Sequence, residues 1–243
     1  MKSSIYIFCI IVLCSCKPLA AKLILGVDTT PEWQTNGEIE QAFKNYEIPE
    51  INRFVLDTAV YSKNVISKVY KTLDKLKSKE VAIDSVMKSN FEESTSDNLQ
   101  PVQVRYFDSL GLPIFKLVNC YVDNPYKMDW NVDGAFDSYP PYIDNAVLNF
   151  KNQELSFFMP MLSKINGEKV TLAEVPKSEY YAIVFWNDFF KKPSKKLIDK
   201  IQAIENDREN TFVFYVNNNN SEIYELIPED ERAVYFENLK TKL

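Results

Sequence analysis

The chain has 243 residues, of which 46% are hydrophobic, so it is long enough for one or two domains with a sizeable core. Its net charge of -6, without a basic cluster, argues against nucleic acid and anionic lipid surfaces as partners. It has no histidine, and its 5 glycines are widely spaced, which excludes histidine-dependent nucleophiles, histidine-ligated metals and glycine-rich nucleotide loops.

The N-terminus predicts a processed leader. A basic start precedes an apolar run over residues 5–13 and then the sequence Leu13–Cys16. The run would span about 13 Å as a helix, roughly half of a bilayer core, which favours a signal peptide over a membrane span. The stretch Leu13–Cys16 resembles the lipobox of bacterial lipoproteins. This resemblance implies a signal peptide over 1–15 and a lipid on Cys16, whereas the alternative is a buried cysteine in an N-terminal strand.

The residue after Cys16 and the remaining cysteines extend this prediction. Cys16 is followed by Lys17 rather than by the aspartate that resembles an inner-membrane retention mark, so we expect an outer-membrane lipoprotein that faces the periplasm. Cleavage would remove two cysteines and acylation would use Cys16. Cys120 would then be the only free thiol, and no intramolecular disulfide could form.

Residues 16–50 are predicted to be an N-terminal arm, with one short amphipathic segment at 39–46. The next region, 51–150, begins with apolar residues at helical spacing over 52–77, which predicts a surface-packed helix. A second short helix is expected near 83–91, before a polar loop.

Two strands are expected next, over 102–107 and 113–122, joined by a hairpin turn at Gly111. Cys120 lies in the second strand, where apolar neighbours favour a buried and inert cysteine over a reactive thiol. The aromatic segment that follows, 126–142, either packs in the core or lines a ligand groove.

The same segment contains a pattern typical of half a calcium loop. Oxygen-bearing side chains alternate around Gly134, at Asp129, Asn131, Asp133 and Asp137. The final glutamate of such a loop is replaced by a proline, and a hairpin turn at Asp133 and Gly134 is the alternative. Apart from this weak calcium site, no cofactor is expected.

The third region, 151–243, predicts an α/β (or α+β) fold. Asn166 and Gly167 indicate a type I′ hairpin. An apolar strand over 181–186, a helix and a second strand over 211–216 form a βαβ unit on a sheet covered by helices. The asparagine run 217–220 is expected to be a solvated turn, and a last helix is expected from Pro228 onward.

Residues 157–216 resemble the thioredoxin-like fold of periplasmic thiol-disulfide and peroxiredoxin-like lipoproteins. The shared features are the hairpin "NGE-x-VTL", the strand "AIVFW" and the helix start "NDF-FKKP-SKKL". The family carries Cys-x-x-Cys at this helix start, where Phe190 and Pro193 stand instead. The resemblance implies a hydrophobic groove without disulfide exchange.

The resemblance weakens beyond residue 216, because the family continues with a helix, a hairpin and another helix and only 27 residues remain. A different α/β sheet that shares one βαβ unit is the alternative. Two functions follow: a lipid-anchored, non-catalytic protein that binds a protein or peptide partner, or an enzyme that uses Cys120 or carboxylates. No nucleotide or nucleic acid partner is expected.

Overall fold

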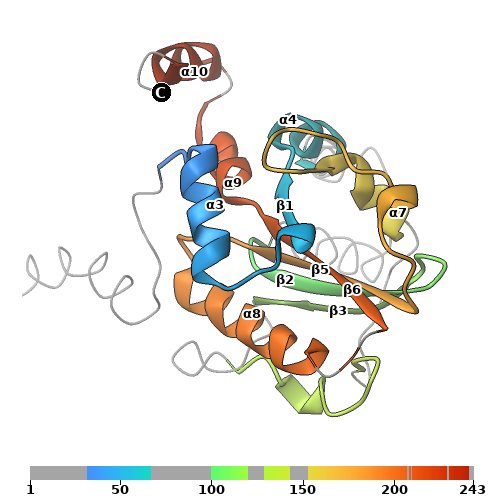
Figure 1. Cartoon of the computed structure of the whole chain (residues 1–243). Coiled ribbons are helices and arrows are strands. Elements are labelled where there is room, and N and C mark those ends of the chain that lie inside the picture. The colour runs from blue at the N-terminus through green and yellow to red at the C-terminus, as the bar shows by residue number, and fades with distance from the viewer. Residues whose placement is uncertain are drawn as a thin grey trace, which may run out of the picture.

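The computed structural model shows a mixed α/β fold built on a six-stranded sheet of order β3-β2-β5-β6-β1-β4, which confirms the predicted fold class (Figure 1). It describes residues 32–66, 100–119, 129–142, 153–206, 208, 210–228 and 230–240. Within these ranges, no helix is both long and apolar enough to cross a membrane.

The sheet is parallel at its centre and antiparallel toward both edges. Strands β5, β6 and β1 run parallel, β2 and β3 form an antiparallel pair beside β5, and β4 is antiparallel to β1. The strands are β1 (Arg53–Leu56), β2 (Gln103–Asp108), β3 (Pro113–Val118), β4 (Leu162–Ser163), β5 (Tyr180–Trp186) and β6 (Thr211–Asn217).

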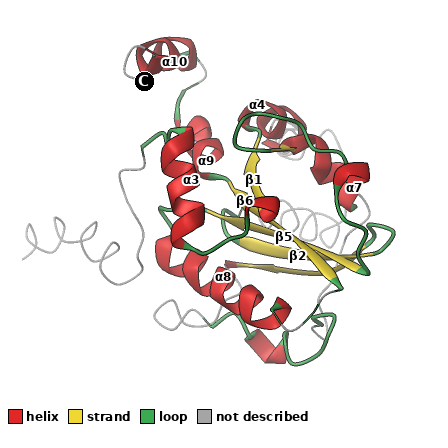
Figure 2. Cartoon of the chain, in the orientation of Figure 1, coloured by secondary structure: helices red, strands yellow, loops and turns green. Residues whose placement is uncertain are grey.

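Helices cover both faces of the sheet (Figure 2). The α-helices are α3 (Asn36–Asn45), α4 (Thr58–Tyr61), α7 (Leu155–Phe158), α8 (Lys191–Glu205), α9 (Asn219–Leu226) and α10 (Arg232–Lys240). Single turns of 3-10 helix are Glu50–Asn52, Val132–Gly134, Met159–Met161 and Leu172–Glu174, and Ser62–Ile66 is a π-helix.

Two hydrophobic clusters lie on the two faces of the sheet. Along β5, Ala182 and Val184 contribute to the cluster under α3 and α8, whereas Ile183 and Phe185 contribute to the cluster under α7. Because both faces are covered, the strand is a continuous apolar run rather than an alternating one. This explains why the sequence of β5 and β6 predicted their positions well.

The predicted βαβ unit is confirmed, since α8 connects the parallel strands β5 and β6. The hairpin between β2 and β3 is also confirmed, and Gly111 has the positive φ (80°) expected at its turn. The two regions expected on either side of residue 150 contribute strands to one sheet, because β2 pairs with β5.

The helix predicted over 52–77 is wrong at its start. Residues 53–56 form β1, which is held between β6 and β4. Phe54 and Leu56 are buried on one face while Arg53 and Val55 are only partly buried, so sheet pairing overrides the helical spacing. Of the remaining helix, residues 67–77 lie outside the described residues, as does the second short helix near 83–91.

The turn at Asn166 and Gly167 needs only one residue with positive φ, whereas the expected type I′ turn needs two. Gly167 has a positive φ of 85°, but the φ of Asn166 is not positive, so the type I′ prediction is wrong. The Lys164 amide donates to the Glu168 carbonyl (2.8 Å) and the Gly167 amide donates to the Lys164 carbonyl (2.9 Å). This is a three-residue hairpin loop, in which only the glycine needs the left-handed region.

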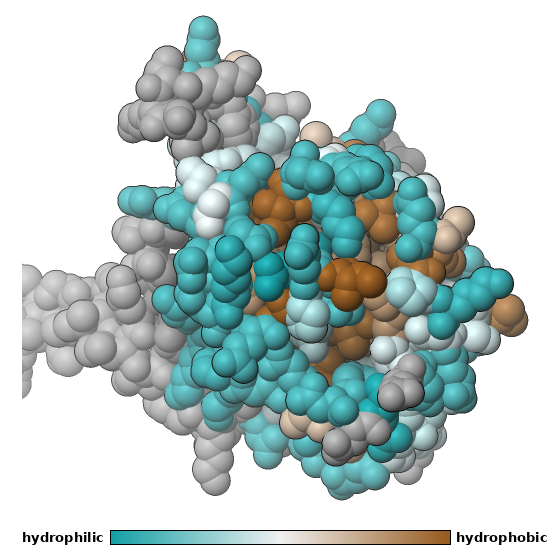
Figure 3. Space-filling view, in the orientation of Figure 1, coloured by the Kyte–Doolittle hydropathy of each residue, from teal (hydrophilic) through white to brown (hydrophobic). Residues whose placement is uncertain are grey.

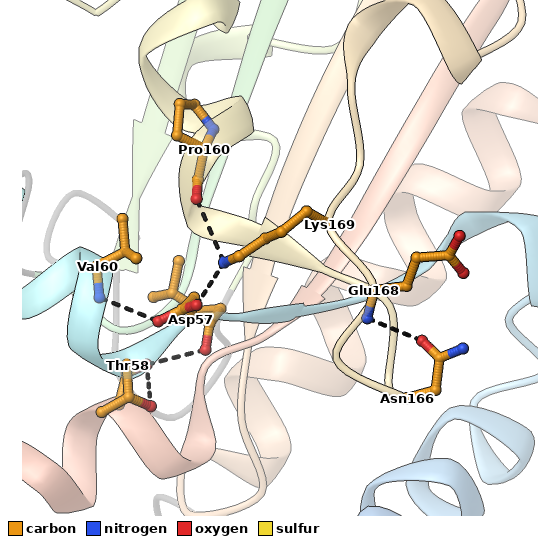
Figure 4. A network of polar contacts seen from close by, with 9 residues as sticks. Asp57, Thr58, Val60, Pro160, Asn166, Glu168 and Lys169 are labelled. Atoms are coloured by element: carbon orange, nitrogen blue, oxygen red, sulfur yellow. Dashed lines mark hydrogen bonds and ion pairs between the residues drawn. The ribbon is translucent and has the colours of Figure 1, made fainter.

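This hairpin is fastened to the start of α4 (Figure 4). The Asp57 carboxylate caps α4 by accepting from the Val60 amide (3.0 Å), and the Lys169 ammonium donates to the same carboxylate. Burial alone would raise the pKa of Asp57, but these hydrogen bonds outweigh it and hold the pKa below its usual range. The ion pair therefore joins β1 and α4 to the hairpin after β4.

Helix α3, expected within an N-terminal arm, is instead part of the core. Thr35 and Glu38 form a capping box at its start, and Phe43 is 0% exposed. The Phe43 ring packs edge-on against the Trp186 indole of β5, with ring centroids 5.1 Å apart. The short amphipathic segment therefore covers the end of the central strand.

We predict that Phe43→Ala lowers the free energy of unfolding by about 3–5 kcal/mol, because it leaves a cavity against Trp186. Urea denaturation measures the change. Gln41→Ala on the exposed face of the same helix is the control and should stay within about 0.5 kcal/mol. Equal stability of both variants would show that α3 is a dispensable arm.

Candidate functional site

The carboxyl ends of the parallel strands β5 and β6 meet at one edge of the sheet, where α/β proteins place their ligands. Phe190 is the N-cap residue of α8 and Pro193 lies in its first turn, as predicted. Pro193 is buried, and its carbonyl accepts a hydrogen bond from the Trp130 indole (3.2 Å). A proline is tolerated there because the amide it lacks would have no intrahelical partner.

A network of asparagine side chains closes this edge. Asn187 directly follows β5. Its side-chain Nδ2 donates to Asn218 Oδ1 (3.1 Å), and its Oδ1 accepts from the Phe190 backbone amide (2.8 Å). Asn218 in turn donates to the Pro101 carbonyl (2.8 Å), just before β2. The network therefore fixes the start of α8 to the ends of β5 and β6 and to the segment that enters β2.

The solvated turn expected at 217–220 is wrong. Asn217, Asn218 and Asn219 are 2%, 3% and 2% exposed, and residues 219–226 form α9. These polar side chains can be buried because most of their groups bond to the backbone or to one another, for example Asn219 Oδ1 with the Asp188 amide (3.2 Å). Their composition resembles a loop, but their partners make them part of the interior.

Ser194 joins the same network from the first turns of α8. Its hydroxyl donates to the Asn187 carbonyl (2.8 Å) and accepts from the Asn187 amide (3.2 Å). The side chain is 0% exposed, and the chain has no histidine that could activate it. Ser194 therefore has a structural role: its two hydrogen bonds hold the first turns of α8 to the residue that follows β5.

Gln34 extends the network toward α3. The Gln34 backbone exchanges two hydrogen bonds with the Asn220 side chain (2.8 and 2.9 Å), and the Gln34 amide group donates to Asp188 Oδ2 (2.8 Å). The start of α3 is thereby tied to the loop after β5 and to α9. None of these asparagine and glutamine roles follows from the sequence, because they depend on which strand ends meet.

A groove of about 800 Å³ lies between α3 and α8, beside this edge. Its wall from α8 carries Lys191, Lys192, Lys195, Lys196 and Asp199; the remaining lining residues are Gln34, Glu38, Gln41, Ala42, Asn45, Tyr46 and Asp188. Hydrophilic residues accordingly cover α3 and α8 on the face seen in Figure 3. The repeated lysines at the start of α8 are visible in the sequence, but only the position of α3 turns them into one wall of a groove.

The hydrophobic groove expected from Phe190 and Pro193 is not the one observed. Neither residue is among those that line the groove, because Pro193 is buried and Phe190 packs against the hydrophobic cluster. The apolar part of the lining comes from Ala42, Tyr46 and the methylene stems of the lysines. Burial, with Asp188 and Asp199 nearby, raises the pKa of the Tyr46 phenol, so this group stays neutral.

The far end of α8 holds a second polar cluster. Glu205 accepts hydrogen bonds from the hydroxyl groups of Tyr106 (2.8 Å) and Tyr139 (3.2 Å), and burial raises the pKa of its carboxyl although these bonds oppose the shift. The Arg208 guanidinium lies 4.0 Å from the centre of the Tyr139 ring. The cluster fastens the segment 129–142 to the helix.

Most of the described aromatic residues in this segment serve packing. Trp130 is 2% exposed, and Phe136 and Tyr139 pack against the same cluster as α3 and α8. Tyr142 is 61% exposed, and Tyr126 lies outside the described residues. The sequence left open whether this aromatic segment packs in the core or lines a ligand groove, and Trp130, Phe136 and Tyr139 pack in the core.

The loop with the calcium-like pattern makes hydrogen bonds within itself. Asp129 Oδ1 accepts from the Asn131 amide (2.9 Å), and Asn131 Nδ2 donates to Asp137 Oδ1 (2.8 Å). Asp133 and Gly134 both have positive φ. Within the described ranges, no group of three or more histidine, cysteine, aspartate or glutamate side chains is placed to hold a metal ion. Calcium binding at this loop stays a prediction.

The two cysteines singled out from the sequence, Cys16 and Cys120, lie outside the described residues. Comparison with known proteins gives no further guide: no protein-family model, curated protein or solved structure matches the chain. Among the described residues, the head of α8 and the groove beside it are the features that bear on function.

We predict that Asn187→Ala lowers the free energy of unfolding by about 2–4 kcal/mol, because the Phe190 amide and Asn218 Oδ1 lose their partner in the interior. Chemical denaturation provides the measurement. Asn36→Ala at an exposed position of α3 should change stability by less than about 0.5 kcal/mol. A similarly small loss for Asn187→Ala would show that the network does not hold the strand ends.

Proposed function

We propose that this protein is a lipid-anchored protein of the cell envelope, held in the outer membrane through Cys16, whose α/β domain binds a protein or peptide partner without thiol chemistry. The observation that carries the proposal is the head of α8, where Phe190 is the N-cap residue and Pro193 is buried. The resemblance implies a Cys-x-x-Cys pair at these two positions. A phenyl ring and a buried proline can neither form a thiolate nor exchange a disulfide.

The order of the strands supports a distant relationship to the thioredoxin-like fold. The family implied by the resemblance has its hairpin after the βαβ unit. Here the antiparallel hairpin β2–β3 lies beside β5 but precedes it in the chain. We interpret the domain as a degenerate thioredoxin-like sheet whose hairpin comes earlier in the sequence.

A single-cysteine thiol protein is the second candidate function. The register of the sheet gives the position of the strand that precedes this cysteine in the sequence. Gln103, at the start of β2, pairs with Phe185 of β5 on one side and with Val118 of β3 on the other. The end of β3 therefore lies at the same edge of the sheet as the head of α8. Cys120 follows that strand end by two residues in the sequence, and a thiol reaction of Cys120 stays the alternative.

We predict that Cys16→Ala abolishes acylation and releases most of the protein from membranes, because the lipid is the proposed anchor. Labelling with a radioactive fatty acid, followed by fractionation, tests both effects. Cys14→Ala, two residues earlier, is the matched control and should retain label and membrane association. Tight membrane association of the unlabelled Cys16→Ala protein would contradict the proposal.

We also predict that the protein does not accelerate the reduction of insulin by dithiothreitol, with a thioredoxin as the positive control. Cys120→Ser should give the same trace as the unaltered protein. Robust turnover that is lost in Cys120→Ser would instead establish the single-cysteine alternative.

A further inference from the structure

We propose that the groove between α3 and α8 binds an acidic peptide segment in which carboxylates flank an apolar side chain. The inference rests on the proposed function, since it names the partner chemistry of a non-catalytic binding domain.

The cationic wall is the first observation. Lys191, Lys192, Lys195 and Lys196 recur along α8 at a spacing that places them on one side of the helix. They lie in its first two turns, where the helix dipole adds positive potential. In a chain with a net charge of -6, this is a local excess of positive charge, so the expectation that the chain has no basic cluster is wrong at the start of α8.

The acidic residues of the lining are already engaged within the protein. Glu38 accepts from the Thr35 amide (2.8 Å) in the capping box, and Asp188 accepts from the Gln34 side chain (2.8 Å). Asp199 pairs with Lys195 (2.7 Å). The carboxylates therefore have partners within the protein, one of them Lys195 of the wall itself. Four lysines and three carboxylates in the lining leave an excess of one positive charge. This arrangement favours a ligand that brings carboxylates of its own.

The floor and the opposite wall favour a peptide. Ala42 and Tyr46 provide apolar surface for a side chain. Gln41 and Asn45 on α3 share one hydrogen bond, from Gln41 Nε2 to Asn45 Oδ1 (2.9 Å), and their amide groups have further donor and acceptor capacity for a peptide backbone. The lining on α8 extends from residue 191 to 199, about 12 Å along the axis, which matches about four residues of extended chain. The volume of about 800 Å³ lies within the usual range of ligand pockets.

The test uses the full chain, purified from membranes in detergent, and a fluorescein-labelled hexapeptide, Glu-Glu-Leu-Leu-Glu-Glu. We expect saturable binding by fluorescence anisotropy, at least about tenfold weaker for Gln-Gln-Leu-Leu-Gln-Gln and about tenfold weaker at high salt. The variant Lys191→Glu with Lys196→Glu should lose about tenfold or more in affinity. Lys177→Glu, at an exposed position outside the groove, should bind like the unaltered protein.

The charge reversals are compatible with folding. Both lysines are exposed, a glutamate in the first turn of α8 suits the helix dipole, and a glutamate at 196 lies one turn before Lys200. Unchanged thermal unfolding would verify that the variant is intact.

Absence of saturable binding, equal binding of both peptides, or full binding by the intact Lys191→Glu, Lys196→Glu variant would overturn the proposal. Tighter binding of an acidic oligosaccharide such as oligogalacturonate would replace the peptide by another class of ligand and also overturn it. Each result leaves anchoring and the absence of thiol turnover to be judged separately by fractionation and by the insulin assay.

Discussion

The hydrogen-bond network at the carboxyl ends of β5 and β6 is the constraint on which the arrangement of this domain depends. Asn187 connects the strand end to the first turn of α8, and Asn218 connects it to the segment before β2. Each hydrogen bond adds only about 0.5–1.5 kcal/mol to the free energy of unfolding. Removing one partner costs more, because the other is then left buried without a hydrogen bond. The network therefore fixes one geometry for three elements that meet at this edge.

The position of α3 follows from the same edge. Gln34 binds Asn220 and Asp188, so the helix begins beside the ends of β5 and β6. Phe43 then packs on Trp186, which holds the rest of the helix against the sheet. Polar bonds hold the start of α3, and apolar contacts hold the rest of the helix against the sheet. As a result, α3 lies alongside α8, and the groove lies between them.

The sequence predicts well those elements whose signal is local. Strands β5 and β6 are apolar runs covered on both faces, and the turn at Gly111 needs a residue that tolerates positive φ. It predicts poorly those elements that tertiary contacts decide. Residues 53–56 become a strand only because β6 and β4 flank them, and the asparagine run is buried only because its partners come from distant segments.

The same distinction applies to the candidate site. The sequence places Phe190 and Pro193 correctly at the head of α8, because the strand before them is a continuous apolar run and the helix after them has apolar residues at helical spacing. The sequence wrongly predicts that these two residues line a groove. The hydrogen bond from the Phe190 amide to Asn187 and the bond from Trp130 to the Pro193 carbonyl hold this turn in the interior. An apolar, thiol-free helix start can be buried in this way, whereas a redox pair must stay accessible to its substrate. The absence of a thiol at 190 and 193 and the burial of this turn are thus physically compatible, and the groove lies instead along the side of α8, where the lysines are.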